Sequence, residues 1–332
     1  MLISLKDIAE ALNLSKTTVS WILSGKGEAK GFSEETIKLV KDYAKKVNYR
    51  PNLLARSLSL GTTNTIGLIV PFIGDTFYAQ IAQAIETEAE KKNYLLTICS
   101  SEGNSDHEID LIRILRSKQV DGLIIAPTKD SLSEIKKLKK DSFPFVLIDR
   151  YFPKLETNYI VVNNEESSFL LVTHMLKEKC KKIALLTSDV HLLVMNLRLQ
   201  GYKNALKEAN AINDEDLILE IQRSDYRNDT IRQLDILLEK HPDVDGFYFA
   251  THYLALEAIR YFLTKKIDYR ERFTLACFHE TQALDILAPE MLIARMPIDN
   301  IGKEAIDILL KNITEKTLPP EYLILENELI NL

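Results

Sequence analysis

The residues best placed to make specific polar interactions lie near the N-terminus, where polar side chains recur at helical spacing. Lys16, Thr17 and Ser20 fall on or near the outward face of a short helix predicted to follow a turn at residues 13–15. An ammonium group and two hydroxyls can donate hydrogen bonds to base edges and to phosphate oxygens. A short helix of this kind, behind a turn of three or four residues, is typical of a segment that reads the major groove of DNA.

No set of residues in the sequence matches a catalytic or metal-binding motif. Glycine is scarce, at 11 of 332 residues, and the cluster Gly25, Gly27 and Gly31 misses the dinucleotide-binding spacing by one residue. The cluster also follows a predicted helix, where that motif needs a strand. The six histidines are scattered, and there is no nucleophile elbow, no HExxH and no paired-cysteine spacing. We therefore expect no enzyme activity, no metal and no cofactor.

Three short helices must position the polar residues. Ser4 and Asp7 have the spacing of a capping box, and Ser15 and Ser33 can cap the second and third helices. Apolar residues at helical spacing predict a shared core; they are Ile8, Ala9, Leu12, Val19, Ile22, Leu23, Ile37, Val40, Ala44 and Val47. The sequence thus predicts a small all-α domain over residues 1–50, which we call the head.

Three sequence motifs resemble those of a known family. They are LKDIAEALNLSKTTVS, NYRPNLLARSL and TIGLIVP, in this order over about seventy residues. Together they resemble the helix-turn-helix domain, hinge helix and following strand of the lac repressor/GalR family of bacterial transcription regulators. The resemblance implies a DNA-binding domain at 1–50 and a hinge helix with linker at 51–63. The DNA-binding residues that it implies are Ser15, Lys16, Thr17, Thr18, Ser20, Trp21, Tyr49, Asn52, Arg56 and Leu58. Lys16 and Thr17 would be the main sequence readers, and the hydroxyls of Ser15, Thr18 and Ser20 phosphate contacts.

The hinge suggests its own mechanism. In the family this helix orders on DNA and wedges a leucine into the central base step of the minor groove, and Leu58 matches that position. An apolar wedge unstacks a step at a cost of about a few kcal/mol. Flexible pyrimidine–purine steps lower the cost, so we expect one at the operator centre. The alternative is that Leu58 only packs the hinge against a neighbour.

Trp21 departs from the family pattern. In the family, arginine usually follows the segment that corresponds to Thr18-Val19-Ser20, and arginine reads guanine with two hydrogen bonds. Tryptophan cannot do this, although it can contact a thymine methyl group or cover the DNA backbone. The alternative is a half-buried core residue, so the sequence does not assign an operator.

The charge distribution is uneven along the chain. The formal net charge is −6, but residues 1–62 hold ten Lys or Arg and six Asp or Glu, a net of +4, which leaves −10 for the rest. A basic head favours contact with phosphate, although a surplus of this size is also within ordinary surface variation.

The composition also indicates the cellular compartment in which the protein is expected. No apolar run approaches the ~20 residues of a membrane span, and Lys6 and Asp7 interrupt any N-terminal signal sequence. The three cysteines are far apart and odd in number, as expected for free thiols in a reducing compartment. We expect a cytoplasmic protein without membrane contact.

From residue 64 onward, apolar strand-like runs alternate with amphipathic helical stretches. Such alternation predicts parallel sheets covered by helices on both faces, and about 270 residues are enough for two lobes. Words such as VDGLIIAPT, YIVVNNEESS and RMPIDNIG extend the resemblance. They imply an α/β two-lobed, periplasmic-binding-protein-like (type I) effector domain over 64–332, crossed three times by the chain. We expect lobe one at about 64–162 and 292–320, and lobe two at about 163–288 and 321–332.

Lobes of this kind bind ligands at the carboxyl ends of their strands, in the cleft between them. Family positions that line the ligand correspond to Phe77, Tyr78, Asp149, Arg198, Tyr226, His252 and His279. Arg198 is the strongest candidate, because a guanidinium can hold hydroxyls, a carboxylate or a phosphate. Tyr226 could stack on a sugar or a base.

Two departures bear on the effector. The family often has carboxylates where this chain has Thr251-His252 and Phe278-His279. Their loss favours an anionic effector, a sugar acid or phosphosugar, held by Arg198 with His252 or His279. The alternative for each histidine taken alone is a hydrogen-bonded structural role.

These features predict a regulator that acts by default as a repressor. It would bind a pseudo-palindromic double-stranded operator as a homodimer, since no heptad tail follows Leu332 to pair dimers, and would respond to a small carbohydrate-derived effector. The alternatives are a nucleobase-responsive regulator of the same fold, a solute-binding protein with the same lobes, and an architectural DNA-binding protein. The last two are disfavoured by the head and by the large body, respectively.

Overall fold

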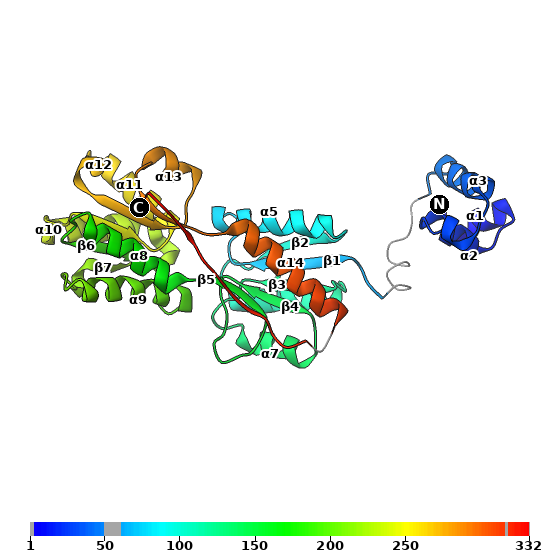
Figure 1. The fold of residues 1–332 in the computed structure, drawn as a ribbon, viewed down its shortest axis with the longest axis horizontal. Coiled ribbons are helices and arrows are strands. Elements are labelled where there is room, and N and C mark those ends of the chain that lie inside the picture. Colours follow the sequence, from blue (N-terminus) through cyan, green and yellow to red (C-terminus); the bar gives the residue numbers. More distant parts are fainter. Residues whose placement is uncertain (1–2, 50–60, 316–317, 332) are drawn as a thin grey trace. The chain divides into compact units, whose positions relative to one another are not determined.

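The computed structural model describes residues 3–49, 61–315 and 318–331. They form two compact units, Met1–Asn64 and Thr65–Leu332 (Figure 1). The helices of the first unit are α1 (Leu5–Leu12), α2 (Lys16–Leu23), the 3₁₀ turn η1 (Glu28–Lys30) and α3 (Glu34–Lys46).

The head helices begin where the sequence predicts. The Ser4 hydroxyl accepts a hydrogen bond from the Asp7 N–H at 3.3 Å, and the Asp7 carboxylate accepts one from the Ser4 N–H at 2.8 Å, a complete capping box. The predicted core is confirmed except at Val47, which is half-buried but is not part of it, and Leu12 and Leu23 pack half-buried against it. Its buried members are Ile8, Ala9, Val19, Ile22, Ile37, Val40 and Ala44.

The first sheet of the second unit has the strand order β11-β5-β4-β3-β1-β2, and its neighbours are parallel. Its strands are β1 (Thr65–Val70), β2 (Leu95–Ser100), β3 (Gly122–Ile125), β4 (Phe145–Ile148), β5 (Tyr159–Val162) and β11 (Tyr322–Leu325). Its helices are α5 (Thr76–Lys91), α6 (Ser105–Ser117), α7 (Leu132–Lys140) and α14 (Ile298–Thr314). Alternate residues of β1 enter different apolar layers: Leu68 and Val70 pack with α5 and α14, and Ile69 packs with α6 and α7.

The second sheet has the order β12-β10-β9-β8-β6-β7. Its strands are β6 (Ile183–Thr187), β7 (Ile218–Glu220), β8 (Gly246–Phe249), β9 (Thr274–Phe278), β10 (Leu292–Arg295) and β12 (Glu328–Ile330). The helices are α8 (Asn164–Lys177), α9 (Leu193–Glu208), α10 (Tyr226–Lys240), α11 (His252–Thr264), α12 (Tyr269–Arg272) and α13 (Gln282–Leu287), with 3₁₀ turns η2 (Glu215–Leu217) and η3 (Arg223–Asp225). The two-lobed architecture is therefore confirmed, as is a chain that crosses between the lobes three times (Figure 1).

The expected lobe boundaries were wrong near the C-terminus. Strand β10 pairs with β9 in the second sheet, although 292–320 was assigned to lobe one. Strand β11 pairs with β5 in the first sheet, although 321–332 was assigned to lobe two. The short strand β12 runs antiparallel to β10, so the second sheet is not wholly parallel. Short strands of three or four residues carry too few alternating positions to predict which sheet edge they join.

Candidate functional site

The N-terminus of α2 presents polar side chains outward. Ser15 precedes the helix, and its Oγ accepts a hydrogen bond from the Thr18 N–H at 2.9 Å and lies 2.8 Å from Thr18 Oγ1. This cap holds the first turn, where Lys16 and Thr17 are exposed. The opposite side of α2 is buried in the head core, so the exposed turn is backed by a rigid apolar layer.

The residues predicted to bind DNA fall into three groups. Four are exposed, namely Ser15, Lys16, Thr17 and Trp21. Three are half-buried, namely Thr18, Ser20 and Tyr49. Asn52, Arg56 and Leu58, with the hinge helix itself, lie outside the described residues. The role of each of these residues on DNA stays a prediction.

Trp21 combines features of both interpretations of its role. Its side chain is 37% exposed. The Phe32 ring lies 6.2 Å away between centroids, and the Lys30 ammonium lies 5.0 Å from the centroid of the Trp21 ring. The connection after α2 therefore covers part of the indole and places a positive charge near its ring, while about a third of the side chain stays exposed.

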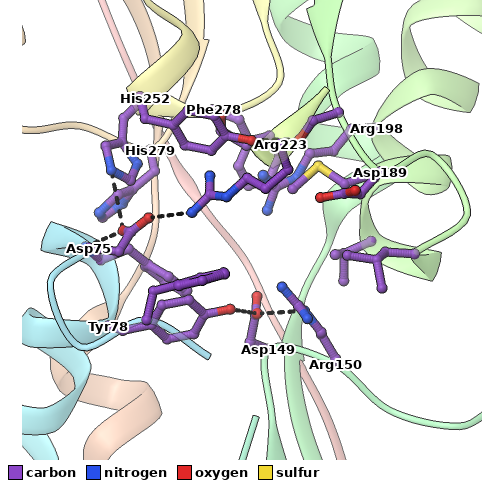
Figure 2. Close-up of a pocket in the computed structure, with 18 of the residues that line it drawn as sticks. Asp75, Tyr78, Asp149, Arg150, Asp189, Arg198, Arg223, His252, Phe278 and His279 are labelled. Atoms are coloured by element: carbon purple, nitrogen blue, oxygen red, sulfur yellow. Dashed lines mark hydrogen bonds and ion pairs between the residues drawn. The ribbon is translucent and has the colours of Figure 1, made fainter. Parts of the chain in front are cut away.

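A cavity of about 70 Å³ lies between the two lobes, where strands of both sheets end (Figure 2). Loops after β1 and β4 supply its walls from lobe one, and loops after β6, β7, β8 and β9 supply its walls from lobe two. This volume is about half of the ~150 Å³ that admits benzene to a protein cavity. The space that the side chains of the two lobes leave between them is therefore narrow.

Most of the predicted effector residues line this cavity. They are Phe77, Tyr78, Asp149, Arg198, His252 and His279. Tyr226 is not among the lining residues, although its ring lies 5.3 Å from that of the lining residue Tyr253. The carboxyl ends of parallel strands thus bring together side chains more than 200 positions apart in the sequence.

Arg198 is buried and held from two sides. Its Nε donates to the Asn164 Oδ1 at 2.8 Å, and its Nη1 donates to the Ala250 carbonyl at 2.6 Å. Its guanidinium carbon lies 3.6 Å from the centroid of the Phe278 ring. Burial lowers the pKa of the guanidinium below its ordinary value. No carboxylate lies within 4 Å of it among the described residues, so the site contains a buried cation held only by neutral groups.

A second polar group lies at the end of β4. The Tyr78 hydroxyl donates to the Asp149 Oδ2 at 2.7 Å, and the Arg150 Nε lies 3.4 Å from the same oxygen (Figure 2). Burial, with the neighbouring carboxylate, raises the pKa of Tyr78 well above its usual range. Asp149 has a φ of 62°, which few residues other than glycine adopt, and such strained positions concentrate at functional sites. Asp149 is therefore a fixed acceptor in the cavity.

His279 differs from both expectations made for it. It is only 3% exposed, and neither ring nitrogen has a hydrogen-bond partner among the described residues. Burial, together with the neighbouring His252 and Arg198 side chains, lowers its pKa to about 3. The imidazole is therefore neutral near pH 7. It can donate one hydrogen bond and accept one.

Several cavity residues escaped the sequence reasoning, above all Asp75, Asp189 and Arg223. Asp75 caps α5, and its Oδ1 accepts the Phe77 N–H at 3.1 Å. An Asp directly before a predicted helix was a signal for the cap, but nothing in the sequence pairs it with Arg223. The cavity therefore holds two carboxylates, Asp75 and Asp189, in addition to the predicted Asp149.

The described residues contain one group with metal-ligand spacing. Ligand atoms of Asp214, Asp216 and His241 lie within 4.8 Å of one another. The Lys240 ammonium is bonded to the Asp216 carboxylate, so that acid already has a cationic partner. No helix in the part of the chain that the structure describes is long and apolar enough to cross a bilayer.

Two parts of the sequence match models of known protein families. Residues 4–52 match "Bacterial regulatory proteins, lacI family", and residues 63–330 match "Periplasmic binding proteins and sugar binding domain of LacI family". The chain belongs to the lacI family of bacterial regulatory proteins. Its head is the family's helix-turn-helix domain, and the protein is a DNA-binding transcription regulator.

Individual members of the lacI family are similar in sequence to this chain over nearly its full length. The chain is 27% identical over 315 residues to the HTH-type transcriptional repressor PurR of Aliivibrio salmonicida (strain LFI1238), covering 94% of this chain and 93% of that protein. It is 27% identical over 320 residues to catabolite control protein A of Priestia megaterium, covering 96% and 95%. The lac repressor dimer bound to operator and the anti-inducer ONPF shares the fold, with a TM-score of 0.85 at 19% identity over 99% of this chain and 98% of that chain.

Proposed function

We propose that this regulator is a repressor that binds a pseudo-palindromic operator as a homodimer in the cytoplasm. The observation that carries the proposal is the exposed polar first turn of α2, held by the Ser15 cap over a buried core. Relatives named as transcriptional repressors support the sign of regulation. Those relatives are regulators by name, in keeping with a protein that is not an enzyme. A solute-binding protein would share the lobes but not the match of residues 4–52.

Lys16 and Thr17 are the proposed sequence readers. The test is fluorescence anisotropy against DNA fragments selected from a random pool by the full-length protein, at several salt concentrations. Lys16→Ala should weaken binding and alter the preferred sequence, because it removes a donor to base edges. Lys41→Ala is the matched control, since Lys41 is an exposed lysine on α3. If the two variants lost equal affinity for the DNA, the effect would come from net charge alone, and the assignment of Lys16 as a sequence reader would be refuted.

The hinge residues Asn52, Arg56 and Leu58 complete the proposed DNA contacts. Leu58 is the proposed minor-groove wedge, because an apolar side chain can kink the duplex and let it contact more of the protein. Leu58→Ala should weaken operator binding and leave effector binding unchanged. Unchanged operator affinity would refute the wedge.

The proposed effector is a small carbohydrate-type molecule with one acidic group. A buried charge without a carboxylate in direct contact is costly, and Arg198 is such a charge in the cavity wall, with Asp149 as its nearest acidic influence. Asp149 and the neutral His279 can hold hydroxyls, and the aromatic side chains of Phe77 and Tyr253 also line the cavity. A nucleobase-type effector is the second candidate, because the same rings could stack on a base.

A thermal-shift screen against neutral sugars, sugar acids, phosphosugars and nucleobases tests this proposal. A bound acid should stabilise the wild type and fail to stabilise Arg198→Gln. It should also change the affinity for operator DNA, because the coupling between the two sites is reciprocal. Stabilisation by a neutral sugar alone, equal in both proteins, would refute the acidic group.

The homodimer has structural support on the outer strand of the first sheet. On β2, Leu95 is 67% exposed and Ile98 is 40% exposed, although parallel sheets are normally covered. We propose that this edge belongs to the dimer contact. Light scattering of Leu95→Lys should show a smaller mass than that of the wild type.

A further inference from the structure

Asp75 contacts two side chains that come from the other lobe. It lies in the loop between β1 and α5 of lobe one. Its Oδ2 lies 3.6 Å from an Nη atom of Arg223, and its Oδ1 lies 3.3 Å from the His252 Nε2 (Figure 2). Arg223 and His252 follow strands β7 and β8 of lobe two. One carboxylate therefore connects the two sides of the cleft.

Arg223 is held between aromatic rings of both lobes. Its guanidinium carbon lies 4.0 Å from the centroid of the Tyr253 ring in lobe two and 4.7 Å from that of Phe72 in lobe one. Cation–π contacts of this kind are stronger when they are shielded from water, and the Arg223 side chain is only 26% exposed. The arginine thus bridges the lobes by charge and by stacking.

The position of Asp75 prepares it for this contact. Its backbone precedes α5, so the first N–H groups of that helix favour a negative charge here. Burial opposes ionisation of Asp75, but His252, the Phe77 N–H and Arg223 outweigh burial and hold its pKa below the ordinary value. Asp75 is only 11% exposed. In this contact the Asp75 carboxylate therefore favours its charged form and is largely shielded from water.

We propose that Asp75, Arg223 and His252 form an interlobe clasp that sets how far the cleft opens and thereby the affinity for the effector. The clasped cleft has a cavity of about 70 Å³, too small for a sugar. An effector must break the Asp75–Arg223 contact, either by separating the lobes or by displacing the arginine. Asp75 and Arg223 are thus positioning residues whose contact competes with ligand entry.

The test uses the full chain and needs no ligand. Wild type, Asp75→Asn, Arg223→Gln and the double variant are compared by hydrogen exchange with mass spectrometry. Asparagine is also a good helix cap, so Asp75→Asn removes the charge and keeps the cap. Arg227→Gln is the matched control, because Arg227 lies on α10 and pairs with Glu257 of its own lobe at 3.6 Å.

Arg223→Gln should speed exchange about fivefold in the lobe-one segment 72–80, the scale of one partly buried contact. Arg227→Gln should leave that segment unchanged. Asp75→Asn should speed exchange in the lobe-two segment 250–256, and the double variant should add little to either single change. A lobe-one segment that does not respond to Arg223→Gln, or effects that add fully in the double variant, would overturn the clasp.

This inference rests on the proposed effector site only for its consequence on affinity. The exchange experiment reports on the lobes themselves. Failure of the effector screen would leave its result intact, and failure of the clasp would leave the Arg198 proposal standing.

Discussion

Gly201 lies in α9 where that helix packs against α8, and Arg198, which lines the cavity of the proposed effector site, is on the same helix. An ideal Cβ placed there would lie 2.2 Å from the Glu165 carbonyl oxygen and 2.7 Å from the Ser168 Cβ, both on α8. Contacts below 3.0 Å are essentially absent in proteins. Gly201→Ala must therefore move α9 away from α8 by about 1 Å, because backbone atoms of a packed helix cannot rotate aside.

The size of the effect follows from two opposing terms. Overpacking a well-filled interior costs about 1–3 kcal/mol, and the backbone clash places this case at the upper end. Alanine in place of glycine in a helix returns about 1 kcal/mol. We expect a net loss of about 2 kcal/mol in the free energy of unfolding.

The same displacement should reach the ligand site. Arg198 lies one turn before Gly201, and its 2.8 Å hydrogen bond to Asn164 joins α9 to α8. A shift of about 1 Å would stretch that bond beyond a normal hydrogen-bond length. Gly201→Ala should therefore weaken binding of any effector that Arg198 holds, by about tenfold or more.

Urea unfolding followed by circular dichroism measures the first effect, and the thermal-shift response to the screened acids measures the second. Gly74→Ala is the control, because nothing lies within 4 Å of a Cβ added there. It should change stability by less than about 0.5 kcal/mol. A Gly201→Ala protein as stable as the Gly74→Ala protein would refute the claim that α8 and α9 need a glycine at their contact.

Three further predictions concern single side chains. Ser33→Ala removes the hydroxyl that accepts the Thr36 N–H at 3.3 Å and should destabilise the head by about 1 kcal/mol in thermal unfolding; no change would mean that water replaces the cap. Trp21 is the only tryptophan in the sequence, so its fluorescence emission can be followed alone. Operator DNA should change this emission, whereas an effector alone should not. Emission that does not change on addition of operator DNA would mean that the indole does not contact the DNA. His279 has a pKa of about 3 when folded against about 6.5 when unfolded, so the unfolded chain takes up its proton first as pH falls. Between pH 7 and pH 5 the wild type should therefore lose about 2 kcal/mol relative to His279→Gln in urea titrations, and parallel losses would refute the neutral imidazole.

The proposed mechanism couples these parts through the cleft. The cavity proposed as the effector site is lined by loops of both lobes, so a ligand that prefers one lobe spacing would shift the population toward that spacing. The clasp at Asp75 adds a preference of the protein itself. Its removal and the binding of an effector should therefore act on the same equilibrium.

Local features of the chain were readable from the sequence alone. Ser4, Ser15 and Ser33 cap helices where their spacing predicts, because a cap depends on residues only two or three positions away. The alternation of apolar runs in the body determined the two covered sheets, because side-chain periodicity is a property of each segment. The polar first turn of α2 was predicted for the same reason, since its exposed and buried faces follow from helical spacing.

Long-range pairings were decided only by the tertiary structure. Strands β10 and β11 joined the sheets opposite to those expected, because a four-residue strand pairs with whichever edge the crossing chain brings near. The Asp75–Arg223 contact joins positions 148 apart, and nothing in either local sequence specifies the other. His279 shows the same limit: its residue type suggested a cation, but burial beside Arg198 and His252 makes it neutral. Its protonation state depends on its neighbours in space and on its distance from water, which the sequence does not contain.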